Sequence, residues 1–86
     1  MITLRHIEIY QKYNGNGDGF VRCATQEEKD IMDYNHWSLI DLLVQDLFII
    51  QKGLASASFV KTIENKLQEN CDNKETVQAI KTIRFL

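Results

Sequence analysis

The feature that most constrains this chain is the segment from residue 37 to residue 50, where apolar residues recur at the spacing of an α-helix. The stripe consists of Trp37, Ile40, Leu43, Val44, Leu47 and Phe48, and it is widened by Leu39, Leu42, Ile49 and Ile50. Lys52 suits the negative end of a helix dipole, and Gly53 suits the left-handed position after a helix. We therefore predict a central helix over His36–Lys52, capped by Asn35.

Two shorter amphipathic segments follow the central helix. Their apolar residues are Phe59, Val60, Ile63 and Leu67 in the first segment and Val77, Ile80 and Ile83 in the second. Ser56 or Ser58 can cap the first, and Asp72, followed three residues later by a glutamate, has the spacing of a capping box before the second. We predict helices over Ala57–Asn70 and Asn73–Arg84, which form an αα-hairpin folded back against the central helix.

The first thirteen residues predict a further helix, over Thr3–Tyr13, with Thr3 as its N-cap. Its apolar residues recur every three positions and are Leu4, Ile7, Tyr10 and Tyr13. A period of two also fits part of this segment, and Asn-Gly pairs lead from it into residues 20–24. A β-hairpin therefore stays open as an alternative for this region.

Glycine marks one break in the chain, because three of the four glycines lie between residues 15 and 19 and proline is absent. After this break, Thr25 and Glu28 have the spacing of a capping box and predict a short helix over Gln26–Asp33. With 86 residues, the chain allows a single domain over residues 1–86. We predict an all-α bundle of four to five short helices with a Gly/Asn-rich loop after the first helix. The predicted core consists of Trp37, Ile40, Leu43, Val44, Leu47, Phe59, Ile63, Leu67, Val77 and Ile80.

The charge of the chain makes nucleic acid a poor partner. Ten Lys and Arg against twelve Asp and Glu give a net charge of -2, which lacks the positive field that draws proteins to phosphate backbones. The charge is unevenly distributed along the chain. Seven acidic and two basic residues lie within Asn14–Asp46, whereas six basic and four acidic residues lie from Leu47 to Leu86. We expect no nucleic-acid partner and interpret the uneven charge as solvated helix faces.

The N-terminus has no apolar run of the kind found in secretion signals, and charged residues interrupt the segment Leu39–Ile50. We therefore expect no membrane partner and a cytoplasmic location, where Cys23 and Cys71 stay reduced. A disulfide between them requires an oxidising compartment. The two cysteines lack the spacing of a structural zinc site, and we expect no cofactor.

The most distinctive stretch is residues 14–22, which read Asn-Gly-Asn-Gly-Asp-Gly-Phe-Val-Arg. This stretch resembles the first half of the calcium loop of EF-hand and dockerin-type proteins. The residues that the resemblance implies are Asn14, Asn16 and Asp18 as side-chain ligands, Gly19 as the turn and Phe20 as the carbonyl donor. Position twelve is Thr25 instead of an acidic residue, so weak calcium binding is our second hypothesis. The first is a glycine-rich connector whose polar side chains bond their own backbone.

Residues 33–37 form a second candidate, because a carboxylate, a phenol, an imidazole and an indole meet where two predicted helices join. Asp33 and His36 have a spacing that can place two ligands on one metal, but the sequence offers no third. We interpret Trp37 as a core anchor and His36 as a solvent-facing residue. Neither histidine lies in a nucleophile motif, and no phosphate-binding loop is present, so we do not expect an enzyme.

An interaction protein is the function that these exclusions favour. The central helix has more apolar surface than its flanking helices can cover, and its excess residues are Leu39, Leu42, Phe48, Ile49 and Ile50. We predict that they bind a protein partner and that a homodimer is the first form to test. In the alternative, residues 14–25 fold over this face, with Phe20 and Val21, and complete a monomer.

Overall fold

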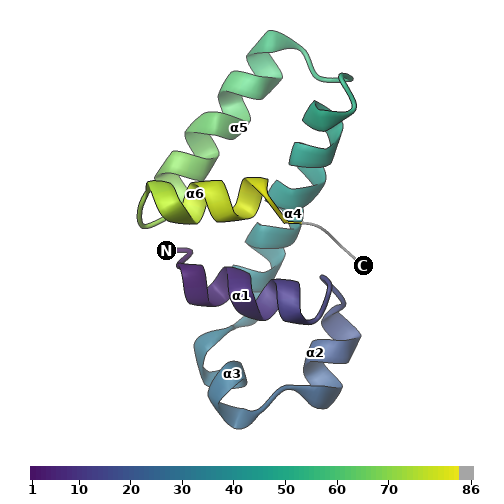
Figure 1. Cartoon of the computed structure of the whole chain (residues 1–86), viewed down its shortest axis with the longest axis vertical. Coiled ribbons are helices and arrows are strands. Elements are labelled where there is room, and N and C mark those ends of the chain that lie inside the picture. The colour runs from purple at the N-terminus through teal and green to yellow at the C-terminus, as the bar shows by residue number, and fades with distance from the viewer. Residues whose placement is uncertain (84–86) are drawn as a thin grey trace.

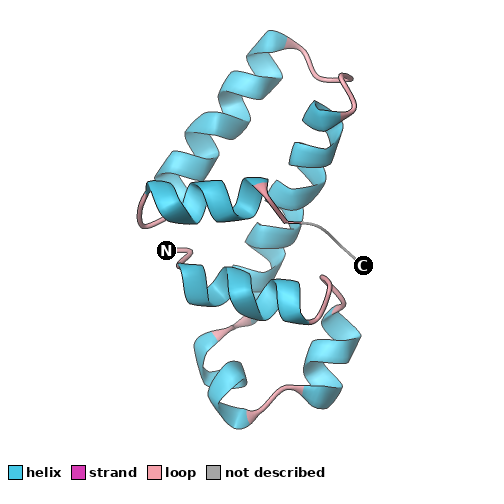
Figure 2. Cartoon of the chain, in the orientation of Figure 1, coloured by secondary structure: helices cyan, strands magenta, loops and turns pink. Residues whose placement is uncertain are grey.

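A computed structural model describes residues 1–83, and this part of the chain is all-α (Figure 1). The helices are α1 (Leu4–Lys12), α2 (Gly17–Cys23), α3 (Gln26–Ile31), α4 (Tyr34–Gln51), α5 (Ala57–Asn70) and α6 (Lys74–Lys81). Figure 2 shows no strand among the described residues, which contain one isolated β-bridge, between Ile2 and Cys71. The all-α prediction is confirmed, and the β-hairpin alternative is wrong.

Each described helix begins with a short polar side chain that accepts the backbone N–H three residues further on, which satisfies a donor that the helix itself cannot. These N-caps are Thr3, Asn16, Thr25, Asp33, Ser56 and Asn73. The predicted caps Thr3, Thr25 and Ser56 are confirmed. Gly53, with φ of +73°, takes the predicted left-handed position after α4.

The start of the central helix differs from the prediction. Asp33 caps α4, since its Oδ1 accepts the His36 N–H at 2.8 Å, and the helix begins at Tyr34. The predicted cap, Asn35, lies inside the first turn and does not interrupt the helix. A carboxylate is the better cap here because the positive end of the helix dipole favours a negative charge.

The sixth helix also differs at both of its predicted ends. Asn73 is its N-cap, and Asp72 accepts the hydroxyl of Thr76 instead of forming a capping box. The helix ends at Lys81, because Thr82 is its C-cap. Arg84, the predicted end, lies outside the described residues.

A helix stands where the sequence predicted a loop. Asn14 and Gly15 both have positive φ angles, 51° and 70°, which turn the chain sharply after α1. Asn16 then caps α2 by accepting the Gly19 N–H at 3.1 Å. Glycine disfavours helices, so the prediction of a loop rested on intrinsic propensity, which the packing of Phe20 overrides.

The central element is α4, with α5 folded back beside it and α1 and α6 lying across it (Figure 1). Although α1 and α6 come from opposite ends of the chain, they pack against each other. The predicted hairpin of α5 with α6 is therefore wrong in geometry, because α6 turns across α4 instead of running back along α5 (Figure 1). None of the described helices is long and apolar enough to cross a membrane.

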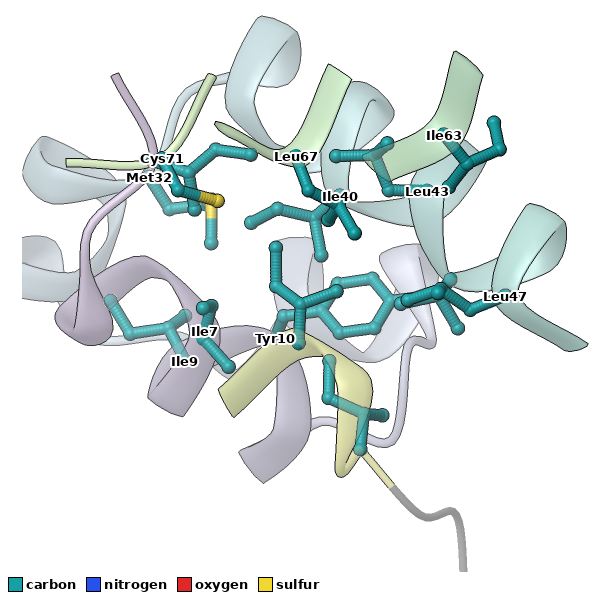
Figure 3. Packing of buried hydrophobic residues seen from close by; sticks show 14 residues of the cluster. Ile7, Ile9, Tyr10, Met32, Ile40, Leu43, Leu47, Ile63, Leu67 and Cys71 are labelled. Carbon is teal, nitrogen blue, oxygen red and sulfur yellow. The ribbon is translucent and has the colours of Figure 1, made fainter. Parts of the chain in front are cut away.

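The core lies where α4 meets α1, α5 and α6 (Figure 3). Its buried apolar residues are Ile2, Ile7, Ile9, Tyr10, Met32, Ile40, Leu43, Val44, Leu47, Ile63, Leu67, Cys71, Ile80 and Ile83. Of the predicted core, Trp37, Phe59 and Val77 are only partly buried and pack at its edge, whereas the other predicted residues are buried. The prediction missed the contribution of the N-terminal segment, whose burial depends on its docking against α6.

The N-terminus is tied to the turn between α5 and α6. The Ile2 N–H donates to the Asn70 carbonyl at 2.7 Å, and the Asp72 N–H donates to the Ile2 carbonyl at 3.0 Å. Burial raises the pKa of the neighbouring Cys71 thiol, which keeps it protonated. Cys71 and the exposed Cys23 are both free thiols.

Candidate functional site

An open groove of about 650 Å³ lies between α2 and the first half of α4. It is lined by Gly15, Asn16, Gly17, Asp18, Phe20, Val21, Met32, Asp33, Tyr34, Trp37, Ser38 and Asp41. The groove therefore brings together the two stretches that the sequence singled out separately, the glycine-rich residues 14–22 and the polar-aromatic residues 33–37. A concave surface of this volume is in the range of ligand-binding pockets.

Aromatic rings form the apolar wall of the groove. The Trp37 ring lies 4.9 Å from the Tyr10 ring and 5.1 Å from the Phe20 ring, measured between centroids. Phe20 in turn meets Tyr13 edge to face at 5.5 Å. The cluster holds α2 against α1 and α4, and it leaves part of Trp37 open to solvent.

Gly17 lies beside the indole ring of Trp37 at one end of the groove. A Cβ atom placed on Gly17 would lie 3.6 Å from Trp37 Nε1, at ordinary contact distance. A larger side chain at position 17 would extend toward the indole ring and fill this end of the groove. The predicted role of Trp37 as an anchor is correct, but the ring lies at the wall of a groove and not inside the core.

Three carboxylates line the groove, from Asp18, Asp33 and Asp41. Asp41 is engaged, since it accepts the Tyr10 hydroxyl at 2.7 Å and the Gln45 amide at 3.1 Å. Asp33 uses Oδ1 for the cap of α4 and for His36 Nδ1, both at 2.8 Å. The Asp18 carboxylate has no partner among residues 1–83.

The calcium hypothesis depends on oxygens that the structure places differently from a ligand loop. Asn14 lies in the turn after α1, the Asn16 side chain caps α2, and Asp18 lies in the first turn of that helix. Gly19 and Phe20 are inside the helix, so the Phe20 carbonyl accepts the Ala24 N–H at 2.9 Å. The described part of the chain contains no group of three His, Cys, Asp or Glu side chains that could hold a metal.

The two histidines stack on each other behind the start of α4. His6 and His36 have ring centroids 4.2 Å apart and an angle of 10° between their planes. The Thr3 N–H donates to His6 Nδ1 at 3.0 Å, so the ring proton sits on Nε2, which donates to the Ile31 carbonyl at 3.1 Å. The prediction that His36 points to solvent is wrong, because its ring stacks on His6 and bonds to Asp33, which leaves 26% of its side-chain surface exposed.

The electrostatics of the pair follow from this packing. Burial and the neighbouring His36 lower the pKa of His6 below its usual 6.5. The hydrogen bonds from the His36 backbone and imidazole lower the pKa of the Asp33 carboxyl. Both histidines are thus occupied by structural contacts, and neither hydrogen-bonds to Ser38 or Cys23 within the described residues.

Beside the groove, Glu28 fastens α3 to α1. Its buried carboxylate accepts bonds from Lys12 Nζ at 2.8 Å, the Tyr13 hydroxyl at 2.7 Å and the Thr25 N–H at 3.0 Å. These donors, Lys12 first, lower the pKa of Glu28 to about 2. The sequence identified this residue as half of a capping box, whereas its contacts with α1 required the tertiary structure.

The excess apolar residues of α4 divide into two groups. Leu42 and Ile49 are exposed, at 59% and 40% of their surface. Leu39, Phe48 and Ile50 are partly buried and pack against the core. The alternative in which residues 14–25 cover this side is wrong, because Phe20 packs on Trp37 and leaves Leu42 and Ile49 exposed.

A comparison with known protein families and searches of curated proteins and of solved structures found no match to this chain. The interpretation of the surface therefore depends on its own geometry. Two features stand out in residues 1–83: the groove between α2 and α4, and the exposed aliphatic side chains further along α4. Both are suited to binding, since the groove is concave with an aromatic wall and the side chains on α4 are exposed and apolar.

Proposed function

We propose that this chain is a protein-binding helical module that packs the exposed side of α4 against a helix of another polypeptide. The observation that carries the proposal is the exposure of Leu42 and Ile49 on one line of α4. These residues are seven positions apart, which is close to two helical turns, so their side chains project from the same face about 10 Å apart. Exposed apolar surface that is concentrated on one element commonly marks an interaction site.

A second copy of this chain is the first occupant to test, because one patch then serves both partners. Along the sequence, the midpoint between Leu42 and Ile49 falls between Gln45 and Asp46. An antiparallel pair of α4 helices related by a two-fold axis at that point therefore brings Leu42 of each copy onto Ile49 of the other. Leu39 and Ile50, which border this side of the helix, would enlarge the contact.

Light scattering coupled to size-exclusion chromatography tests the proposal, with protein from about 10 µM to about 500 µM so that mass action can reveal a weak dimer. We expect the measured mass to rise from one chain toward two over this range. Leu42→Lys places a charge in the contact and should restore the monomer. Val21→Lys is the matched control, since Val21 is an exposed aliphatic residue, at 65% of its surface, on a different helix.

Two results would contradict the assignment. A mass of one chain at every concentration would exclude self-association through α4. A dimer that persists in Leu42→Lys but dissociates in Val21→Lys would place the contact on α2 instead. Circular dichroism of each variant confirms that the helices are intact, so that a lost dimer is not mistaken for an unfolded chain.

A further inference from the structure

The groove between α2 and α4 combines an aromatic wall with an acidic rim, and it is separate from the Leu42 and Ile49 side chains proposed above as a packing surface. Its wall is made by Trp37 and Phe20, whose rings are tilted by 35° to each other. Tyr34 stands at the mouth with 82% of its surface exposed and has no polar partner in the described chain. The groove thus offers ring faces that a ligand can reach.

The charge of the groove has one sign. Asp18, Asp33 and Asp41 line it, and of the described residues no Lys or Arg does so. Asp18 has both carboxylate oxygens available, and Asp33 keeps Oδ2 available, because its recorded bonds all go to Oδ1. A positively charged occupant would therefore gain hydrogen bonds without displacing any that the fold already uses.

The aromatic wall selects among cations. A hard metal ion prefers a shell of oxygens, and the Asn16 side-chain oxygen is already engaged as the cap of α2. An ammonium group is a compact, strongly hydrated charge. A guanidinium group is planar, loses less hydration, stacks on aromatic faces and presents paired donors that match a carboxylate. The combination of accessible ring faces with available carboxylate oxygens on Asp18 and Asp33 fits a guanidinium group best.

We propose that the groove between α2 and α4 binds an arginine side chain within an extended segment of a partner protein. The guanidinium would stack on Trp37 beneath Tyr34 and donate to Asp18 and Asp33 at the rim. The volume of about 650 Å³ exceeds that of one side chain, so the residues next to the arginine would also lie in the groove. Charge complementarity between an acidic groove and a basic segment would also speed the encounter of the two chains.

The only tryptophan of the chain provides a direct readout, since Trp37 lines the groove. The experiment titrates capped pentapeptides with a central arginine, lysine or glutamine in otherwise identical glycine and serine sequences, and follows indole fluorescence. We expect a saturable change with the arginine peptide, at least about threefold weaker binding of the lysine peptide, and no saturation with the glutamine peptide. Salt at about 0.5 M should weaken the binding, because it screens exposed charges.

Two variants each remove one negative charge from the rim of the groove and are expected to keep the helices intact. Asp18→Asn changes an unpartnered carboxylate, and Asp33→Asn retains a side-chain oxygen that can cap α4, which circular dichroism checks. Each should weaken arginine-peptide binding about two- to fivefold, and both together should weaken it more. Glu69→Gln is the matched control, because it removes one exposed negative charge from α5, far from the groove lining.

The outcomes separate this proposal from the packing of α4. Absence of saturation with the arginine peptide, or equal binding of the arginine and glutamine peptides, would overturn it. Equal affinity of the wild type and the Asp18→Asn, Asp33→Asn double variant would overturn it as well. Leu42→Lys should leave peptide binding unchanged, so a loss of dimer without a loss of peptide binding would show that the two surfaces act independently.

Discussion

Different interactions stabilise the two ends of the molecule. Around the middle of α4, the contacts with α1, α5 and α6 are made by buried aliphatic side chains. At the other end, α2 has no buried residue, and the one buried residue of α3 is Glu28. This end is held by stacked rings, by caps and by the bonds of one carboxylate, so we expect it to open locally at a lower free energy than the core.

A short helix of low intrinsic helix propensity therefore persists when its ends are capped and one of its side chains is anchored by packing. Asn16 satisfies the start of α2, and Phe20 anchors it against two other aromatic rings. The same arrangement leaves a groove between α2 and α4. The end of the molecule that we expect to open first is thus also the end that carries the concave surface, as is common for binding elements.

The largest effect should come from a cavity in the apolar half. Leu43 is buried between α4 and its neighbours, and Leu43→Ala should lower the free energy of unfolding by about 2–5 kcal/mol, because the surrounding side chains cannot fill the space. Val21→Ala, on the exposed side of α2, should change it by less than about 0.5 kcal/mol. Urea denaturation measures both, and equal stabilities of the two variants would contradict the division described above.

A smaller and more local effect should follow from Glu28→Gln. The substitution replaces a carboxylate that accepts three hydrogen bonds with an amide, and it removes the negative charge that pairs with Lys12. We therefore expect α3 to loosen from α1. Hydrogen exchange should speed up in residues 17–31 and stay unchanged in α4 and α5. Uniform acceleration along the whole chain would show instead that the two ends unfold as one unit.

Mild acid should destabilise the contact between α1 and α3. Because the pKa of His6 is lowered in the folded state, the unfolded state binds more protons below about pH 6.5, and stability falls as the pH drops from there. Protonation of Nδ1 would also break its bond from the Thr3 N–H. Glu28, with its pKa lowered from 4.5 to about 2, adds a further loss only below about pH 4.5.

The variant His6→Gln isolates this step, because glutamine can occupy the third position of a capping box but does not titrate. Thermal melts of wild type and variant at about pH 7 and about pH 5.5 should show a decline in Tm for the wild type alone. A parallel decline in both proteins would assign the sensitivity to groups other than His6.

The smallest effect should come from calcium. About 10 mM calcium would stabilise the fold by about 1.4 kcal/mol if Asn14, Asn16 and Asp18 bound it with a Kd near 1 mM. We expect less, because the Asn16 oxygen is engaged and Asp18 alone supplies a carboxylate. A rise in Tm of several degrees that disappears in Asp18→Ala would support the calcium hypothesis against this expectation.

Local chemistry was readable from the sequence at the starts of α1, α3 and α5. Thr3, Thr25 and Ser56 were identified as caps because a cap depends on residues within one turn. The fold class and the buried face of α4 were predictable for the same reason, since helical spacing alone aligns Ile40, Leu43 and Leu47.

The groove was not predictable from the sequence, although both of its walls are unusual in composition. Asn16 to Phe20 and Asp33 to Trp37 each showed unusual composition, but nothing in the sequence indicated that they face each other. The loop prediction failed at α2 because propensity disfavours a helix there, whereas the Asn16 cap and the contacts of Phe20 with Tyr13 and Trp37 favour one.

The sequence alone was enough to predict that this protein is all-α, where three of the described helices begin, and which face of the central helix is buried, because those properties depend on spacing and on neighbouring residues. Only the tertiary structure decided that α6 crosses α4 beside α1, that Glu28 joins α3 to α1, and that a groove forms at α2. These features arise from contacts between residues distant in the chain, whose pairing is selected by the packing of the whole fold.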